Sequence, residues 1–161
     1  MADAVTPMVP NDERLGEILQ DARTIAVVGL SSKPDRPSLD VARSLQARGY
    51  RIVPVNPRET EVLGETAYPS LREIPSDVAI DIVDVFRRAE DTPEIARDAV
   101  AVGAKVLWLQ LDIVSEEAGA IASAGGLDIV MGVCIKQESQ RLDRDAKSTE
   151  GTANPTTGDR T

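Results

Sequence analysis

The residues with the clearest chemical potential lie in one stretch, residues 24–38, which reads TIAVVGLSSKPDRPS. An apolar run ends at Gly29, small polar residues and cations follow, and an apolar pattern of helical period then resumes. This order is typical of a buried parallel strand that leads through a phosphate-binding turn into the N-terminus of a helix. We therefore expect this loop to bind an anionic ligand.

The loop departs from both common phosphate-binding motifs. A dinucleotide fingerprint requires glycines two and five residues after Gly29, where this chain has Ser31 and Pro34. A Walker motif requires Gly-Lys-Ser/Thr at the fifth to seventh positions after its first glycine, and this chain has Pro34-Asp35-Arg36 there. The sequence thus predicts an anion site of a different format.

Composition restricts the chemistry that the chain can perform. Its 161 residues contain no histidine, which excludes Ser-His-Asp hydrolysis, Cys-His nucleophiles, histidine-ligated metals and phosphohistidine relays. The single cysteine, Cys134, excludes an intramolecular disulfide and a CxxC centre. A net charge of −9 argues against nucleic-acid binding, because phosphate contacts require a basic face. Any anion site must therefore gather its cations locally.

The sequence shows no targeting or membrane signal. The N-terminus is acidic and lacks an apolar core segment, so it does not resemble a signal peptide. No apolar run approaches the roughly 20 residues that a membrane-spanning helix needs. We expect a cytoplasmic, soluble protein that does not bind membranes.

Apolar periodicity predicts strands alternating with helices. Strands are expected at 24–29, 51–55, 78–86, 105–109 and 128–131, and helices at 11–22, 38–48, 92–102, 115–124 and 135–142, with one helical turn near 70–73. Such alternation favours right-handed βαβ units. The expected fold class is α/β, a Rossmann-like, doubly wound three-layer sandwich with a five-stranded parallel sheet.

The ends of the chain are expected to lie outside this domain. Residues 1–10 contain two prolines and no periodicity and are predicted to be flexible, whereas residues 143–161 are polar and are predicted to form a disordered tail. The domain itself is expected to span 11–142. Pro54 interrupts the second strand and favours an edge strand or a strand end, because proline cannot donate to a neighbouring strand.

In doubly wound folds, ligands bind at the carboxyl ends of the strands, where the strand order reverses. The expected strand ends place there Ser31, Ser32, Lys33 and Arg36, then Asn56, Pro57 and Arg58, then Phe86, Arg87 and Arg88, and finally Gln110. Five of the chain's 18 basic residues would gather at this edge, which favours a phosphate-rich ligand. The alternative is that loops are polar and arginine is common in this chain.

The residues at the end of the second strand restrict the kind of nucleotide that the site can bind. An NAD site usually has an acidic residue there to hold the ribose hydroxyls, but this chain has Asn56 and Arg58. This pair suits a ribose that carries a phosphate, as in NADP and coenzyme A. A hydride-transfer enzyme would also need a substrate domain, for which a chain of this length has no room.

The sequence resembles the small stand-alone CoA-binding domain proteins, which are related to the N-terminal domain of the succinyl-CoA synthetase alpha subunit. The resemblance covers roughly residues 20–142 and rests on IAVVGLSSKPDRPS, RIVPVNP, VLGETAYPSLREIP, DIVDVFRRAEDTPEI, GAKVLWLQLDIVSEEA and VMGVCIKQESQRL. It implies that Gly29, Ser31, Ser32 and Lys33 lie at the pyrophosphate, with the charge of Arg36 assisting, and that Asn56, Pro57 and Arg58 surround the nucleotide. It also implies that Phe86 and Arg87 flank the adenine or pantetheine path and that Gln110 lines the cleft.

The sequence departs from this family near its C-terminus. Many members read Met-Asp-Arg-Cys followed by a histidine, whereas this chain has Met131-Gly132-Val133-Cys134 and a serine, Ser139, near the histidine position. Cys134 has two interpretations, a small buried hydrophobe or a thiol that contacts the thiol of CoA. Asp81 and Asp84 are expected to be structural or solvated rather than a catalytic pair, because they point to opposite faces of a strand.

These observations predict a protein that binds coenzyme A or an acyl-CoA and has no catalysis of its own. The alternatives are an NADP-binding reductase, or a subunit of an acyl-CoA ligase that another chain completes. A third possibility is a regulatory protein that senses the acyl-CoA pool and uses its tail to bind a partner. A protein partner or a homodimer is compatible with each of these functions.

Overall fold

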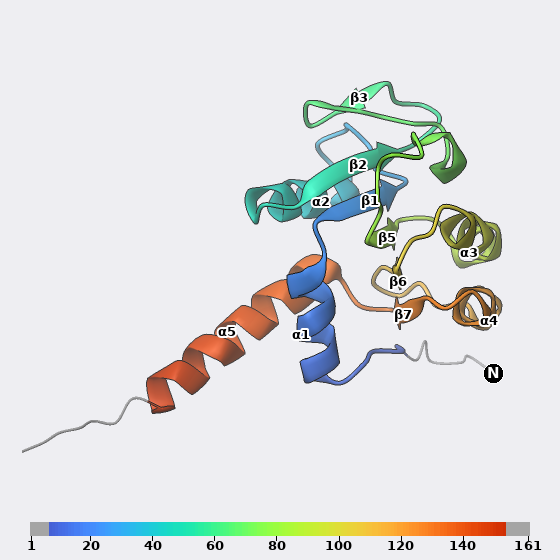
Figure 1. The fold of residues 1–161 in the computed structure, drawn as a ribbon. Coiled ribbons are helices and arrows are strands. Elements are labelled where there is room, and N and C mark those ends of the chain that lie inside the picture. The colour runs from blue at the N-terminus through green and yellow to red at the C-terminus, as the bar shows by residue number, and fades with distance from the viewer. Residues whose placement is uncertain (1–6, 154–161) are drawn as a thin grey trace, which may run out of the picture.

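The computed structural model describes residues 7–153, and the side chains of residues 7–146 (Figure 1). The strands are β1 (Thr24–Val28), β2 (Arg51–Val55), β3 (Glu61–Val62), β4 (Glu65–Thr66), β5 (Ile82–Val85), β6 (Val106–Leu109) and β7 (Asp128–Met131). The helices are α1 (Asp12–Asp21), α2 (Pro37–Ala47), α3 (Thr92–Ala101), α4 (Glu116–Ala124) and α5 (Ile135–Ala153), with 3-10 turns η1 (Leu71–Glu73) and η2 (Ala89–Asp91).

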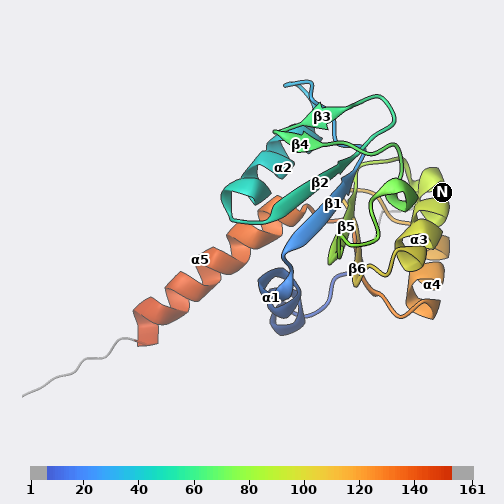
Figure 2. The ribbon, with the colours of Figure 1, turned by 45° about the horizontal axis from the view of Figure 1, so that its top comes forward.

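Five strands form one parallel sheet in the order β2-β1-β5-β6-β7. Helices α1, α2 and α5 cover one face, and α3 and α4 lie side by side on the other (Figures 1 and 2). The expected three-layer, doubly wound α/β fold with a five-stranded parallel sheet is confirmed. Since β1 lies between β2 and β5, the strand order reverses between β1 and β5.

Alternate strand residues supply the two halves of an aliphatic core. Ile25, Val27 and Trp108 face α1, α2 and α5, whereas Val28, Val85 and Leu109 face α3 and α4. Both halves are needed because a parallel sheet is buried on both faces.

Pro54 lies in β2, which is an edge strand of the sheet, one of the two positions that the sequence favoured. The N–H of Arg51 donates to the carbonyl of Arg23, just before β1, and the carbonyl of Val55 accepts from the N–H of Gly29, just after β1, so the backbone groups of odd-numbered β2 residues face β1. Pro54 therefore points outward, where only its carbonyl is used, as the acceptor for the N–H of Tyr68 at 3.0 Å. The missing donor costs the sheet no hydrogen bond.

The long connection after β2 contains more structure than the sequence predicted. Strands β3 and β4 form a short antiparallel hairpin whose turn residues, Leu63 and Gly64, both have positive φ. Val62 is buried, and the Gln46 side chain on α2 donates to the carbonyl of Leu63 at 3.2 Å. The hairpin thus packs onto α2. The helical turn expected near 70–73 is present as η1.

The third predicted strand, 78–86, was too long, since β5 spans only Ile82–Val85. Asp81, just before it, accepts hydrogen bonds from the N–H groups of Arg23 and Thr24 at 2.8 and 3.0 Å. Its carboxylate also forms an ion pair with Lys105 at 3.4 Å. Asp81 therefore joins the starts of three strands, which confirms its structural role.

Both ends of the domain differ from the expected boundaries. Met8 exchanges backbone hydrogen bonds of 2.8 and 2.9 Å with Met131, so part of the predicted flexible N-terminus pairs with the edge strand β7. Helix α5 continues to Ala153 rather than ending at Leu142, so residues 143–153 of the predicted disordered tail are helical. Residues 1–6 and 154–161 lie outside the described residues.

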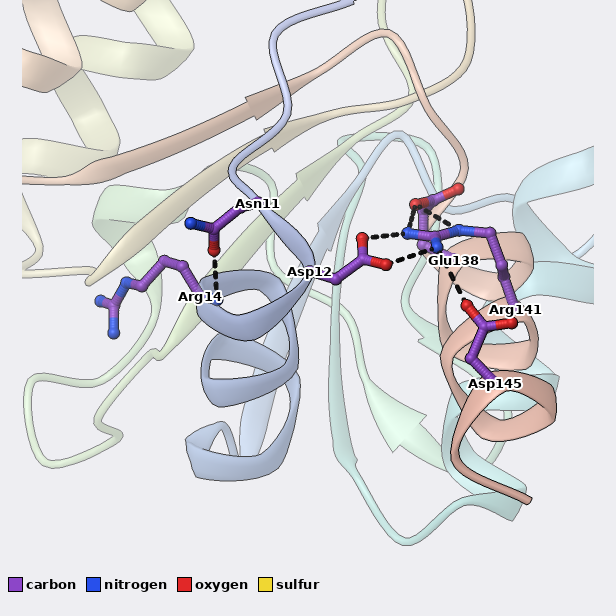
Figure 3. A network of polar contacts seen from close by, with 6 residues as sticks. All are labelled: Asn11, Asp12, Arg14, Glu138, Arg141 and Asp145. Atoms are coloured by element: carbon purple, nitrogen blue, oxygen red, sulfur yellow. Dashed lines mark hydrogen bonds and ion pairs between the residues drawn. The ribbon is translucent and has the colours of Figure 1, made fainter. Parts of the chain in front are cut away.

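A polar network explains why the helix does not end at Leu142 (Figure 3). Arg141 on α5 donates to both carboxylate oxygens of Asp12 on α1, at 2.8 and 3.0 Å. The same guanidinium bonds to Glu138 and to Asp145 within its own helix. These contacts fasten α5 to α1 and span the turn after Leu142, beyond which α5 projects away from the sheet (Figures 1 and 2). Among the described residues, no helix is both long and apolar enough to cross a bilayer.

Asp84 is fully buried in the middle of the sheet, in register with Val27 of β1 and Trp108 of β6. Within the described part of the chain, neither of its carboxylate oxygens has a hydrogen-bond partner. Burial raises the pKa of Asp84 well above its ordinary value. Of the two expected roles, structural or solvated, the solvated one is therefore wrong for Asp84.

This burial predicts a pH-dependent stability. The folded state holds the Asp84 proton more tightly than the unfolded state, so the free energy of unfolding falls as the pH rises from the unfolded pKa to the folded one. Asp84→Asn cannot ionise, and we expect it to raise the free energy of unfolding at neutral pH by about 1–3 kcal/mol. The gain should shrink as the pH approaches the ordinary carboxyl value of 3.8.

Chemical denaturation across this pH range measures the effect. Asp77→Asn, at an exposed position before β5, is the matched control and should leave the pH profile unchanged. An Asp84→Asn variant that keeps the wild-type pH profile would contradict this account of the buried carboxyl.

Candidate functional site

The strand order reverses between β1 and β5, and the chains leaving these two strands go to opposite faces of the sheet. This reversal opens a crevice at the carboxyl ends of the strands. A cavity of about 570 Å³ lies there. It is lined by Gly29, Ser31, Ser32, Lys33, Arg36, Pro37, Ser38, Asn56, Arg58, Glu59 and Phe86.

Gly29 forms the floor of the cavity, where the backbones of three strands meet. Its N–H donates to the carbonyl of Val55 at 2.7 Å, and the N–H of Phe86 donates to the carbonyl of Val28 at 2.8 Å. The φ angle of Gly29 is 90°, and a Cβ at this position would lie 2.6 Å from the carbonyl oxygen of Phe86. The strand end therefore requires glycine for both conformation and space.

The loop after Gly29 is shaped by its own serines. The N–H of Ser31 donates to the Ser38 hydroxyl at 3.1 Å, and the N–H of Lys33 donates to the Ser31 hydroxyl at 3.1 Å. A backbone turn from the N–H of Arg36 to the carbonyl of Lys33 then leads into α2. The hydroxyls of Ser31 and Ser38 therefore fix the shape of a loop that lacks the second and third glycines of a dinucleotide motif.

The N-terminal end of α2 lies at the cavity wall, because Pro37 and Ser38 begin the helix and also line the cavity. Arg36, at the cap position, forms no side-chain capping bond. The first turn of a helix carries partial positive charge and free N–H groups, which favour an anion. The structure thus places a helix terminus beside the loop that the sequence marked as anion-binding.

Asn56 joins the ends of β1 and β2. Its side-chain amide donates to the carbonyl of Leu30 at 3.0 Å, and its side-chain carbonyl accepts from the N–H of Arg58 at 2.9 Å. These bonds hold the Arg58 turn against the loop after β1. Asn56 therefore positions the cavity wall in addition to lining it.

Three cations line the cavity: Lys33, Arg36 and Arg58. In the part of the chain whose side chains are described, none of the three forms an ion pair, although ion pairs are common elsewhere in the domain. Arg87 and Arg88, by contrast, are paired with Asp91 at 3.5 Å. The cavity therefore holds a local positive charge in a chain whose net charge is −9.

Eight of the predicted ligand residues line this cavity, namely Gly29, Ser31, Ser32, Lys33, Arg36, Asn56, Arg58 and Phe86. Pro57 and Arg87 instead line a neighbouring cavity of about 320 Å³, together with apolar residues such as Val28 and Leu71. Pro57 and Arg58 are consecutive, so both cavities border the end of β2. The neighbouring cavity also contains the carboxylates of Glu90, Asp91, Glu94 and Asp98.

Gln110 is not brought to either cavity. It is 4% exposed, and its side-chain oxygen accepts a hydrogen bond of 3.1 Å from the N–H of Ile135, the first residue of α5. The structure therefore does not place Gln110 in the cleft, where it was expected. Its side chain is instead the buried acceptor for the N-terminus of α5. Cys134 is 7% exposed and packs in the core, which favours the interpretation as a small buried hydrophobe.

Three residues that line the cavity were not named individually as ligand residues from the sequence: Pro37, Ser38 and Glu59. Ser38 stands at the predicted helix start, which was a usable signal. Glu59 gave none, since an acidic residue does not suggest an anion site. Its carboxylate accepts hydrogen bonds from the N–H and the hydroxyl of Ser32, at 2.8 and 3.0 Å.

Another cavity, of about 480 Å³, lies between α1, the turn before β2 and α5. It contains Arg23, Arg48 and Tyr50, but Arg48 is neutralised by an ion pair of 2.7 Å with Asp143, which also lines the cavity. Among the described residues, no loop and no helix N-terminus directs free hydrogen-bond donors at this cavity. It matches an anionic ligand less well than the cavity at the carboxyl ends of the strands.

Residues 23–140 match the profile of a protein family described as CoA binding domain. This chain is 46% identical over 127 residues to the uncharacterized protein YneT of Bacillus subtilis, covering 79% of this chain and 93% of that protein. It is 42% identical over 67 residues to the alpha subunit of acetate–CoA ligase (ADP-forming) II of Pyrococcus furiosus. That alignment covers 41% of this chain and only 15% of the ligase subunit.

Solved structures with the same fold include a hypothetical protein from Pyrococcus horikoshii OT3. Its TM-score is 0.81 at 39% sequence identity, and the alignment covers 88% of this chain and 99% of that one. A protein from Thermus thermophilus has a TM-score of 0.78 at 36% identity, covering 83% of this chain and 99% of the other. The likeness therefore extends over the whole domain.

The position of Gly29 predicts a difference between two glycine substitutions. Gly103 also has a positive φ, of 78°, but a Cβ there would meet nothing within 4 Å. We expect Gly103→Ala to lower the free energy of unfolding by about 1–2 kcal/mol, from conformational strain alone. Gly29→Ala adds a collision with a backbone oxygen and should lower the free energy of unfolding by about 2–5 kcal/mol.

Urea denaturation of the two variants measures this difference. Equal losses would show that the space above Gly29 is not limiting and that only its φ angle matters.

Proposed function

This chain belongs to the CoA binding domain family, as its sequence predicted, and on that premise we propose that it binds coenzyme A or an acyl-CoA in the cavity between β1 and β5. The observation that carries the proposal is the set of three cations without ion-pair partners among the described residues, Lys33, Arg36 and Arg58, around a helix N-terminus. Coenzyme A carries a pyrophosphate and a ribose phosphate, so it offers anionic groups to both sides of this cavity.

The loop after β1 is suited to the pyrophosphate. Ser32 would present its N–H and its hydroxyl to phosphate oxygens, and the N-terminus of α2 adds its partial positive charge. The N–H groups of Ser31 and Lys33 are used by hydroxyls within the loop and instead fix its shape. Lys33 and Arg36 would supply charge-assisted hydrogen bonds, which are shorter and stronger than neutral ones. Gly29 would let the ligand approach the strand end without meeting a side chain.

The turn after β2 is suited to the phosphorylated ribose. Arg58 can bind a phosphate through two parallel hydrogen bonds, and Asn56 holds that turn in place. The neighbouring cavity beside Pro57 and Arg87 offers an apolar wall for an adenine ring or for the pantetheine chain. Phe86, half-buried at the end of β5, lies in the wall of the phosphate-binding cavity.

We propose further that binding is not coupled to catalysis within this chain. The sequence contains no histidine to carry a phosphoryl group and no conventional general base of that kind near neutral pH. The buried Asp84 has no hydrogen-bond partner in the described residues and lies in the core, so it is not placed to act on a ligand. A binding or regulatory module fits these features best.

A second candidate is a ligase subunit that another polypeptide completes. It is favoured by the 42% identity with an acetate–CoA ligase alpha subunit, although the matched region is a small part of that protein. Size-exclusion chromatography of the protein with lysate from its own source, followed by mass spectrometry, separates the two. Stable co-elution with an ATP-dependent ligase chain supports the subunit, and elution as a free domain supports the binding module.

Ligand-induced stabilisation is the direct test of ligand identity. CoA at 100 times its Kd should add about 2.7 kcal/mol to the free energy of unfolding, which corresponds to a rise in Tm of about 5–10 °C. Acetyl-CoA should act similarly, and NAD should have no effect. Stabilisation by NADP without stabilisation by CoA would favour the reductase and contradict the proposal.

Charge reversal at the loop tests the site. We expect Lys33→Glu to raise the Kd for CoA about 10- to 100-fold, because it replaces a charge-assisted hydrogen bond with repulsion. Lys105→Glu makes the same charge change at the amino ends of the strands, on the opposite side of the sheet from the cavity, and should leave the Kd for CoA within about twofold. Isothermal titration calorimetry of both variants decides, and equal weakening would place the site elsewhere.

A further inference from the structure

Glu59 is an unexpected residue in a cavity that otherwise suits an anion. It follows the Arg58 turn at the end of β2, where its N–H donates to the carbonyl of Asn56 at 3.2 Å. Its side chain is half-buried and reaches across the cavity to the loop after β1. One carboxylate oxygen, Oε2, accepts both the backbone N–H and the hydroxyl of Ser32, at 2.8 and 3.0 Å.

This pair of donors is the kind that a phosphate oxygen uses. A backbone N–H and a serine hydroxyl that converge on one anionic oxygen are typical of phosphate loops. The Glu59 carboxylate carries the same charge as a pyrophosphate oxygen and receives the same charge-assisted bonds. It therefore occupies the donors that the proposed ligand needs.

The charges around Glu59 support this interpretation. Lys33, Arg36 and Arg58 line the same cavity, yet among the described side chains none forms an ion pair with Glu59. The carboxylate is bonded instead to the neutral groups of Ser32. The contact thus covers the two donors of Ser32 and leaves the three cations available.

We propose that Glu59 is an internal competitor for the phosphate-binding loop, and that a pyrophosphate must displace its carboxylate from Ser32 in order to bind. Ser32 has one N–H and one O–H, and a single oxygen of Glu59 uses both. A second anion in contact with that oxygen would be repelled, so the two cannot share the site. This inference rests on the proposed function and adds a residue that sets its affinity.

Displacement of Glu59 lowers the affinity of the cavity for every anion. A small anion such as inorganic pyrophosphate gains few other contacts and pays the full cost of removing Glu59. Coenzyme A carries further groups for the Arg58 turn and the neighbouring cavity, and these contacts offset the loss. Glu59 therefore weakens both kinds of ligand, and only a ligand with these further contacts keeps a useful affinity for the loop.

The experiment compares CoA and inorganic pyrophosphate on three proteins by isothermal titration calorimetry. Glu59→Gln keeps the size and the acceptor oxygen of the side chain but removes its charge. We expect it to lower the Kd for CoA about tenfold, and to lower the Kd for pyrophosphate by at least as much. Glu61→Gln makes the same charge change two residues away, at an exposed position outside the cavity, and should match the wild type.

The outcomes separate this inference from the proposed function. Unchanged or weaker binding by Glu59→Gln, with wild-type binding intact, overturns the competitor role, and weaker binding means that the carboxylate holds the loop in its binding shape. If no protein binds CoA, the proposed ligand is wrong, and pyrophosphate then tests the loop alone. Tighter pyrophosphate binding by Glu59→Gln supports the competitor, and no difference from the wild type overturns it.

Discussion

The close approach of the β1 and β5 backbones at Gly29 is the constraint on which the site depends. A Cβ at Gly29 would lie 2.6 Å from the carbonyl of Phe86, so only glycine lets the chain turn at this point. The turn sends the following loop to the α2 face, whereas the chain after Phe86 goes to the α3 face. The crevice between them follows from that divergence, and the N-terminus of α2 points into it because the helix begins directly after the loop.

The crevice carries a local positive charge, whereas the chain as a whole is strongly acidic. Elsewhere, several arginines are paired with carboxylates, as at Arg141 with Asp12 and Arg48 with Asp143. At the crevice, one carboxylate faces the loop but bonds to neutral donors. A local cationic site within an acidic protein is selective because long-range attraction for anions is weak and binding depends on contacts at short range.

Much of the fold could be predicted from the sequence because parallel strands and their helices leave periodic apolar patterns. The edge position of Pro54 and the glycine at the end of β1 were also readable, since both follow from local backbone chemistry. The β3–β4 hairpin was not, because each strand has two residues and its turn begins with Leu63 rather than with a residue that favours positive φ. Gln110 and Glu59 were misjudged or missed for a shared reason: their roles depend on partners far away in the sequence, Ile135 and Ser32, which no local pattern reveals.

The central claim is that coenzyme A binds at the carboxyl ends of β1 and β2, over the Gly29 loop. The most direct measurement is a two-dimensional amide NMR titration of the labelled protein with CoA. The account predicts that the largest chemical-shift changes fall on the amides of Ser31, Ser32, Lys33 and Arg58, with little change at Lys105, which lies at the amino ends of the strands. Changes centred on the cavity beside Arg48 and Tyr50, or no saturable change at the loop, would contradict it.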